Sequence, residues 1–378
     1  MTESSEGTRI LGVGDIMLGE TPLSLGRGVL TSWIQNGINP FALISDFLTE
    51  SDVLVGNLEC VISSKSELTG YKAKSLRAPP STVTLLREAG FSVVSVANNH
   101  AMDHGPQAFH DTCDLLERNG VAYCGTDLDP ITLRVRNTSN EDEISVAVVG
   151  ASFHPNQTEF APLYRLIESH SDFTLLCQMV RDASCDAEIV MLLCHWGEEF
   201  VTVPSPYQVR VAKELVRNGA NLIMGHHPHV YQGLQIIGSS PVFFSLGNFV
   251  SDMMQSYLRR AAIAVVEVKP HSKYEARAKP IRIDTAHRPS LSQTKSDYAF
   301  LRMVDQDCAM SLAGEAESRY GSMLKQASAK YKRDKLLDFI FNLGYAPSAK
   351  IELVKDSITK ALYRNLHPNY ESHYPRYA

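Results

Sequence analysis

Apolar runs and helical patterns alternate through the first 230 residues of the chain. Six runs are rich in Val, Ile and Leu and almost free of polar residues, which is typical of strands buried on both faces. These predicted strands are Arg9–Leu18, Val53–Val61, Phe91–Ala97, Ile144–Ala151, Glu188–His195 and Ala220–Met224. The helical patterns between them are Pro40–Thr49, Ser81–Glu88, Pro106–Arg118, Phe173–Ala183 and Pro206–Arg217. The alternation predicts an α/β fold.

After Gly225 the pattern changes to strands without helices between them, over Pro241–Val250, Ala261–Val268 and Pro280–Asp284. Strands appended to βα units predict a second sheet packed on the first. From about residue 297 the chain is helical again, over Ala309–Phe341 and Lys350–Asn365, with a break at Gly344–Pro347. We therefore expect one domain over residues 1–296 and a helical C-terminal appendage over 297–378.

Composition narrows the class of protein. Hydrophobic residues make up 44% of the 378 residues, yet no apolar run approaches the ~18 residues that span a bilayer. The net charge of -6 argues against nucleic acid as the main partner, although the part from residue 301 onward is net positive by 3. Seven cysteines form no CxxC pair, and the N-terminus shows no secretory signal. We expect reduced, mostly buried thiols in a soluble cytoplasmic protein.

Polar clusters follow the predicted strands, each at the point where a strand ends. They are Gly14–Asp15, Gly56–Glu59, Asn98–His100, His195–Glu199, Gly225–His229 and Ser245–Phe249. In open α/β sheets, ligands bind just beyond the carboxyl ends of the strands. Six polar clusters with the same position relative to their strands therefore predict a single site.

The residue types in these clusters suit a metal. Imidazole nitrogens and carboxylate or amide oxygens bind Zn, Mn, Fe or Mg. A lone Asp after Gly is also typical of a turn or helix cap, and a lone buried His often bonds only to backbone. The segment His226–His229 differs, because three histidines in four residues are costly as packing. This segment indicates metal or phosphate binding.

Seven short motifs, taken in order, resemble the CapA family of poly-γ-glutamate capsule biosynthesis proteins, within the calcineurin-like metallophosphoesterase superfamily. They are GDIMLG at 14–19, GNLE at 56–59, RAPP at 77–80, ANNHAMDHG at 97–105, HWGEEF at 195–200, GHHPHV at 225–230 and SLGNF at 245–249. The resemblance covers roughly residues 9–290. It implies a four-layer α/β/β/α metallophosphoesterase-like sandwich with a metal site at the strand ends.

The resemblance also implies roles for individual residues. Asp15 would bind one divalent ion, whereas Asn99 and His195 would bind a second. His227 and His229 would each give one ligand, and His100 would contact the scissile phosphate as general acid. Zn, Mn, Fe or Mg, as one or two ions, would fit these ligands.

Two departures from the common superfamily pattern concern the first metal. Met17 stands where that pattern has a His, and Asn57 stands where it has a bridging Asp. Glu59, two residues further on, would share a strand face with Asn57 and can supply the missing carboxylate. We therefore expect ions of unequal affinity, with the Asn99–His195–His227 position filled more tightly and Asn57 and Glu59 near the other.

The remaining candidates surround these ligands. Asp103 can orient His100 or cap the helix that follows it. The forked guanidinium of Arg77 suits phosphate or carboxylate oxygens, but a salt bridge under a loop is an equal alternative. We expect substrate contacts from His226, Glu199 and Asn248; Glu199 can also support a metal-binding His, and Asn248 can simply hold its turn.

Two function classes follow from these residues and the resemblance. One is a metal-dependent hydrolase that acts on a phosphoester, with amide hydrolysis or transfer as variants. The other is a non-hydrolytic component of poly-γ-glutamate capsule biosynthesis that holds an anionic polymer. The expected partner is accordingly a small anionic substrate or a γ-glutamyl polymer.

Overall fold

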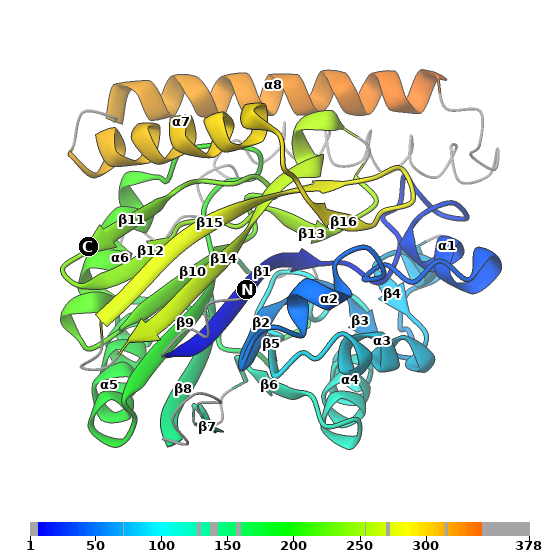
Figure 1. Cartoon of the computed structure of the whole chain (residues 1–378). Helices are drawn as coiled ribbons and strands as arrows, with labels where there is room; N and C mark the ends of the chain where they lie inside the picture. The colour runs from blue at the N-terminus through cyan, green and yellow to red at the C-terminus, as the bar shows by residue number, and fades with distance from the viewer. Residues whose placement is uncertain are drawn as a thin grey trace.

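Two β-sheets lie face to face at the centre of the molecule (Figure 1). The computed structural model describes residues 7–341, except 71, 127–129, 137–142, 156–159, 254, 270–272 and 314–316. The predicted helix Lys350–Asn365 and the break at Gly344–Pro347 therefore lie outside the described residues. Within them, the predicted mixed α/β architecture with two main sheets is confirmed.

The first sheet is centred on β1 (Thr8–Ile16). On one side of β1 the parallel strands β2 (Val53–Leu58), β5 (Val93–Ser95) and β6 (Ala122–Cys124) follow. On the other side are the antiparallel strands β14 (Arg260–Lys269), β15 (Lys273–Ile283) and β16 (Pro289–Leu291). The short β13 (Asn248–Val250) pairs with the end of β1.

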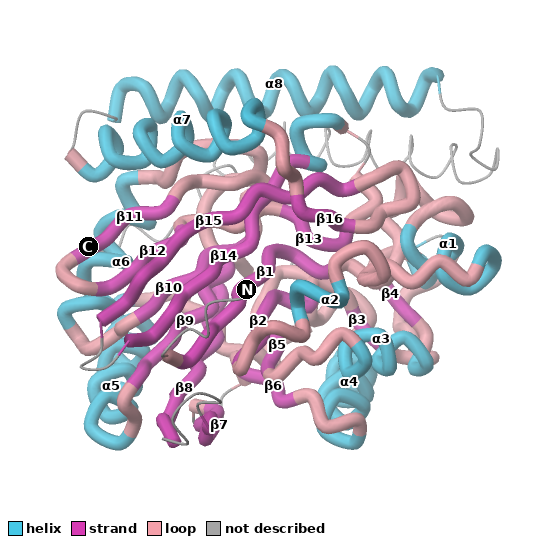
Figure 2. Tube along the Cα trace, viewed as in Figure 1, coloured by secondary structure: helices cyan, strands magenta, loops and turns pink. Residues whose placement is uncertain are grey.

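The second sheet is parallel at its centre and antiparallel at its edges. Figure 2 shows the strands of both sheets in magenta. The order of the second sheet is β11 (Leu234–Ile237), β12 (Ser240–Phe243), β10 (Leu222–His226), β9 (Ile189–His195), β8 (Glu143–Ser152) and β7 (Ile131–Arg136). A separate two-stranded sheet joins β3 (Val61–Ile62) and β4 (Arg77–Ala78).

The alternation of side chains along each strand explains the continuous apolar runs. In β8, Val146 and Val148 face the other sheet, where they pack with residues such as Val55 and Val93. Ala147 and Val149 of the same strand point the other way and pack under helices. Both faces are thus buried, so few polar positions interrupt the strand.

Helices cover the outer face of each sheet. Over the first sheet pack α1 (Val29–Asn36), α2 (Ser45–Leu48), α3 (Val83–Glu88) and α4 (Pro106–Arg118). Over the second pack α5 (His170–Asp186) and α6 (Pro206–Arg217). Short 3₁₀ turns lie at Lys72–Lys74, Pro80–Thr82 and Ser256–Arg259. The bounds predicted for α4 and α6 are confirmed, whereas the predicted helix Pro40–Thr49 is regular only over α2.

Two sheets pack on each other as predicted, but the strands after Gly225 do not form the second sheet by themselves, so that part of the expectation is wrong. β14, β15 and β16 extend the first sheet because β14 pairs antiparallel with β1. β11 and β12 extend the second sheet beyond β10. The predicted strand Pro241–Val250 is also divided, since its first part is β12 in one sheet and its last part is β13 in the other.

Two helices follow the sheets, α7 (Lys295–Leu312) and α8 (Glu317–Phe341). Leu301 and Val304 of α7 are buried with Tyr231 and Ala262. Ala327 and Tyr331 of α8 pack against a small buried cluster beside the polar strand ends. None of the described helices combines the length and the apolar composition that a membrane span requires. All seven cysteines are free, and all but Cys185 are buried, as the sequence predicts.

Candidate metal centre

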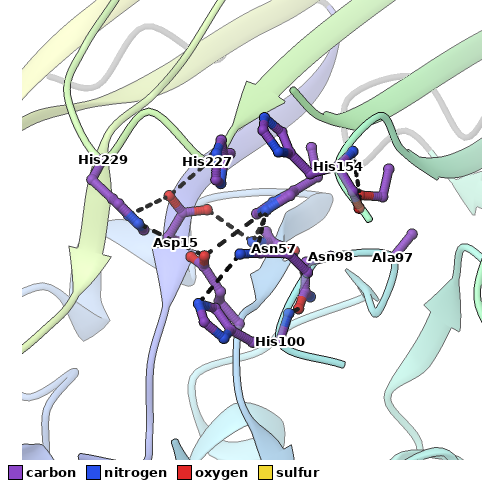
Figure 3. A network of polar contacts seen from close by, with 12 residues as sticks. Asp15, Asn57, Ala97, Asn98, His100, His154, His227 and His229 are labelled. Carbon is purple, nitrogen blue, oxygen red and sulfur yellow. Dashed lines mark hydrogen bonds and ion pairs between the residues drawn. The ribbon is translucent and has the colours of Figure 1, made fainter. Parts of the chain in front are cut away.

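Strand register brings the predicted polar residues together. Asp15 at the end of β1 lies opposite Asn57 on β2 and Asn248 on β13. In the second sheet, His195 at the end of β9 lies opposite His226 on β10. The facing carboxyl ends of the two sheets therefore meet at one place, where Asp15, Asn57, His100, His227 and His229 point toward one another (Figure 3). The predicted convergence at the strand ends is observed for these side chains.

Two buried groups of side chains have donor atoms close enough to share a metal ion. One group is Glu59, His195 and His227, and the other is Asp15, Glu59 and His229; in each, the ligand atoms lie within 4.8 Å of one another. Glu59 belongs to both groups. Its Oε1 lies 3.9 Å from His195 Nε2 and 3.8 Å from His229 Nε2.

Glu59 therefore stands between the two groups, and not only beside Asp15 and His229 as the sequence indicates. Its carboxylate would supply a negative charge that the neutral amide of Asn57 does not carry.

Unpaired polar atoms mark the same place. Both carboxylate oxygens of Glu59 and Nδ1 of His227 are buried without a hydrogen-bond partner among the described residues. Leaving such atoms unpaired costs stability, so native structures rarely do so without a reason. A divalent cation satisfies carboxylate oxygens and an imidazole nitrogen together, so the residues present fit a metal.

The electrostatics of the site favour the protonation states that ligands need. Burial lowers the pKa values of His195 and His227 well below the ordinary histidine value, and neighbouring histidines lower them further. Both rings are therefore neutral, the form that binds metal. Burial would raise the pKa of Asp15, but its contact with His229, 3.2 Å between Oδ2 and Nδ1, holds that pKa below the usual range.

Glu59 behaves in the opposite way to Asp15. Burial and the nearby Asp15 carboxylate raise the pKa of Glu59 well above the ordinary value. The protein alone thus penalises a charge at Glu59, and a bound cation would remove that penalty.

Asn57 faces the carboxylate of Asp15 through its amide nitrogen. Nδ2 donates to Asp15 Oδ1 at 2.8 Å, while Oδ1 accepts a bond from Asn98 Nδ2 at 3.2 Å. Asn98 also donates to the carbonyl of Leu58 at 2.9 Å. In this arrangement Asn57 positions Asp15, and a direct bond from Asn57 to metal stays a prediction.

Asn99, His100 and Asp103 form the side of the site that faces a leaving group in the predicted roles. Asn99 Oδ1 lies 2.8 Å from His195 Nε2, so these two potential ligand atoms are adjacent. Asp103 Oδ2 lies 2.8 Å from His100 Nδ1, which answers the alternative left by the sequence: Asp103 orients His100, and helix α4 has Gly105 as its N-cap without a side-chain bond.

The pair also tunes the acidity of His100. Burial would lower the pKa of His100, but the adjacent Asp103 carboxylate outweighs it and raises that pKa. This shift is in the direction of the protonated form, which a proton donor needs.

Three residues predicted to contact substrate have different surroundings. His226 Nε2 lies 3.1 Å from the carbonyl of Val13, so this histidine links the two sheets. Asn248 Oδ1 accepts from His229 Nδ1 at 3.0 Å and so orients a potential ligand. Glu199 is half-buried and makes no hydrogen bond or ion pair with the described residues, although its charge helps to raise the pKa of His100. Substrate contacts by these three side chains stay a prediction.

Arg77 is engaged by backbone. Its Nε donates to the carbonyl of Ala73 and its Nη1 to that of Ser63, each at 2.8 Å. These bonds tie together the loop between β3 and β4. A contact between Arg77 and an anionic substrate stays a prediction, and Nε and Nη1 already donate to backbone carbonyls.

His154 belongs to the site but is not among the candidates predicted from the sequence. Its ring centroid lies 3.9 Å from that of His227, and its Nε2 lies 2.6 Å from the carbonyl of Gly197. His154 lies just after the end of β8, as the other polar clusters lie just after their strands. This position is the feature of the sequence that could have identified it as a site residue. His154 therefore packs on and fixes a potential metal ligand.

The segment that carries two of the ligands is strained. His227 and His229 have φ values of 94° and 58°, in the left-handed region that residues with a side chain seldom adopt. Such strain clusters at functional sites, where the surroundings hold it in place. Here the backbone N–H of His227 donates to Asp15 Oδ2 at 3.3 Å.

Comparisons with known proteins point in one direction. Residues 9–253 match the family model described as bacterial capsule synthesis protein PGA_cap. The chain is 30% identical over 295 residues to a capsule biosynthesis protein CapA of Bacillus anthracis, covering 71% of this chain and 68% of that protein. It is 26% identical to the PGA biosynthesis protein CapA of Bacillus subtilis, covering 74% and 75%.

More distant likenesses agree with these. A probable polyglutamine synthesis accessory protein of Mycobacterium tuberculosis is 23% identical, over 66% of this chain and 71% of its own length. One solved structure aligns with 72% of this chain at a TM-score of 0.38 and 10% identity, a likeness too distant to carry an argument. The family match over residues 9–253 confirms the resemblance drawn from the seven motifs, and this chain belongs to the PGA_cap family of CapA capsule synthesis proteins.

Proposed function

We propose that this chain is a metal-dependent hydrolase with a metallophosphoesterase-like sandwich, which acts on a phosphoester, or on an amide by the same arrangement. The observation that carries the proposal is the buried Glu59 carboxylate, unpaired among the described residues and shared by two groups of potential ligands. Asp15, Glu59, Asn99, His195, His227 and His229 would hold one or two ions. A divalent ion bound there would polarise the bond under attack and make water a stronger nucleophile.

The protein's own residues would do the rest. His100 would donate a proton from Nε2 to the leaving oxygen or nitrogen, since its Nδ1 is held by Asp103. Asn57 and Asn248 would keep Asp15 and His229 in place. His154 and the strained turn at His227 would fix the group formed by Glu59, His195 and His227.

The experiment is a screen of phosphoesters and γ-glutamyl amides with protein loaded with Zn, Mn, Fe or Mg. His100→Ala should lower turnover by about 10²–10⁴-fold while metal content stays the same. His110→Ala is the matched control, because His110 is exposed on α4. Loss of activity only through loss of metal would remove the proposed role of His100.

The relatives favour a second candidate function. Two are named for capsule or PGA biosynthesis, which suggests that the same pocket holds an anionic polymer without cleaving it. A metal-loaded protein that hydrolyses neither class of substrate but binds oligo-γ-glutamate would support this alternative. We further propose a cytoplasmic location and treat residues 297–378 as an appendage to the catalytic domain; cell fractionation and truncation at residue 296 test these.

A further inference from the structure

A cavity of about 130 Å³ lies between α8 and the body of the protein, next to the metal centre. Phe200 and Val230 form part of its wall, and Val230 directly follows the potential ligand His229. The Phe200 ring stacks on the His229 ring, with centroids 6.0 Å apart, and on Tyr331 of α8, with centroids 4.2 Å apart. The aromatic ring of Phe200 therefore connects the cavity wall, the metal centre and α8.

The charged groups in the lining are cations. Lys330 of α8 has its ammonium 3.6 Å from the centroid of Tyr257 and forms no ion pair with the described residues. The guanidinium of Arg260 lies 4.2 Å from the centroid of Phe300. Arg260 shares one carboxylate, Asp297, with Arg282, so these three charges leave one positive charge in excess.

Tyr257 also lines the cavity, and its side chain carries a buried hydrogen-bond donor that is not used by the described residues. The hydroxyl of Tyr257 is buried and has no hydrogen-bond partner among the described residues. Burial raises the pKa of Tyr257 to about 12, so the hydroxyl keeps its proton at neutral pH. A buried donor of this kind is costly unless a ligand accepts its bond. Thr202 adds a second hydroxyl, and the described lining contains no carboxylate.

We infer that this cavity binds an oxyanion of the substrate, through Lys330, the Tyr257 hydroxyl and Arg260, while the reacting group lies at the metal centre. The inference rests on the proposed function and names the part of the substrate that lies away from the metal. The cavity volume of about 130 Å³ is enough for one carboxylate or phosphate group.

Two sources share this chemistry, the carboxylate of a γ-glutamyl chain and a phosphate group. Titration calorimetry with γ-linked pentaglutamate and, separately, with inorganic phosphate distinguishes them on the full, metal-loaded chain. Tyr257→Phe keeps the ring under Lys330 but removes the hydroxyl, so it separates ligand binding from helix packing. Lys330→Ala removes the charge, and Lys325→Ala, an exposed lysine of the same helix, is its control.

We expect Tyr257→Phe and Lys330→Ala each to weaken binding of one of the two probes by about fivefold, with Lys325→Ala unchanged. The probe that responds identifies the oxyanion. Unchanged affinity in both variants for both probes would overturn the inference, as would an equal loss in Lys325→Ala.

Hydrolysis and metal content measured on the same samples separate the two claims. Failure of the inference alone would appear as normal hydrolysis with no effect of the cavity variants on affinity. Failure of the proposed function would appear as an absence of hydrolysis in the metal-loaded protein, whatever the cavity binds.

Discussion

Two buried carboxylates of this molecule have opposite surroundings. Asp297, at the start of α7, accepts bonds from Arg282 at 2.7 Å, Arg260 at 2.8 Å, Thr294 at 2.9 Å and Ser292 at 2.5 Å. Glu59 is equally buried, and neither of its oxygens has a hydrogen-bond partner among the described residues. Burial would raise the pKa of Asp297, but these bonds hold it below the usual range, whereas the pKa of Glu59 is raised.

The difference separates a structural carboxylate from a binding one. The hydrogen-bonding capacity of the Asp297 carboxylate is satisfied within the folded chain, because guanidinium groups and hydroxyls compensate the cost of its burial. Burial of Glu59 has a cost that protonation offsets in the metal-free protein and that a bound cation would offset in the loaded one. Burial of an acid therefore indicates a site only when its bonds are missing.

The largest expected effect tests the binding half of this comparison. His195→Ala removes a neutral imidazole ligand beside Glu59, so metal affinity should fall by more than about 100-fold and no metal should remain after dialysis. Elemental analysis of the purified variant checks this. His110→Ala should keep the wild-type metal content; equal retention in His195→Ala would mean that His195 is not a ligand.

The structural half is tested by Asp297→Asn. The substitution leaves two guanidinium groups without their buried counterion, so unfolding free energy should fall by about 3 kcal/mol in urea titrations. Because the folded-state pKa of Asp297 is lowered, the carboxylate stabilises the fold above its unfolded pKa, and this contribution is lost as pH falls.

The gap between Asp297→Asn and the wild type should thus be constant at neutral pH and shrink below about pH 4. If the difference in unfolding free energy between Asp297→Asn and the wild type stayed unchanged on acidification, the lost stability would come from packing and not from charge.

A smaller effect of opposite sign is expected from Glu59→Gln. In metal-stripped protein at neutral pH the substitution removes an acid that is ionised in the unfolded chain but whose ionised form is disfavoured by burial in the fold, so stability should rise by about 1 kcal/mol. In metal-loaded protein the same variant should be less stable than the wild type, since the bridging charge is lost. Thermal unfolding with and without added metal measures both; destabilisation in the metal-free state would show that Glu59 is satisfied by the protein itself.

The smallest effect on unfolding free energy should come from an ion pair on the surface, where water solvates both charges. Arg217 Nη1 lies 2.8 Å from Glu214 Oε2, and the two side chains are 71% and 42% exposed. Arg217→Ala should change unfolding free energy by less than about 0.5 kcal/mol. A loss near that of Asp297→Asn would mean that burial is not what distinguishes these carboxylates.

Strand-end positions allowed much of the site to be predicted from the sequence. Asp15, Asn57 and His195 each close a continuous apolar run, and parallel pairing places such ends at one edge. The position of Glu59 between the two groups was not predictable from the sequence. It depends on how the two sheets face each other, and His195 and His227 lie more than 100 residues from Glu59. His154 was missed because its partner His227 lies on a distant segment of the sequence.

Parts of the fold were hidden for a similar reason. Nothing local in β14 shows that it pairs with β1 and not with the strands that precede it. The oxyanion cavity likewise combines Phe200, Tyr257 and Lys330, which no local pattern connects. Local patterns thus predicted the elements, and long-range pairing decided how they combine.

The central claim is that Glu59 joins two metal-binding groups of unequal strength. Anomalous diffraction from crystals soaked in Zn or Mn tests it most directly, because the absorption edge identifies the ion and the map gives its place. We predict a stronger peak among Glu59, His195 and His227 and a weaker one among Asp15, Glu59 and His229. Saturating soaks that leave both positions without anomalous density would contradict the account and favour the polymer-holding alternative.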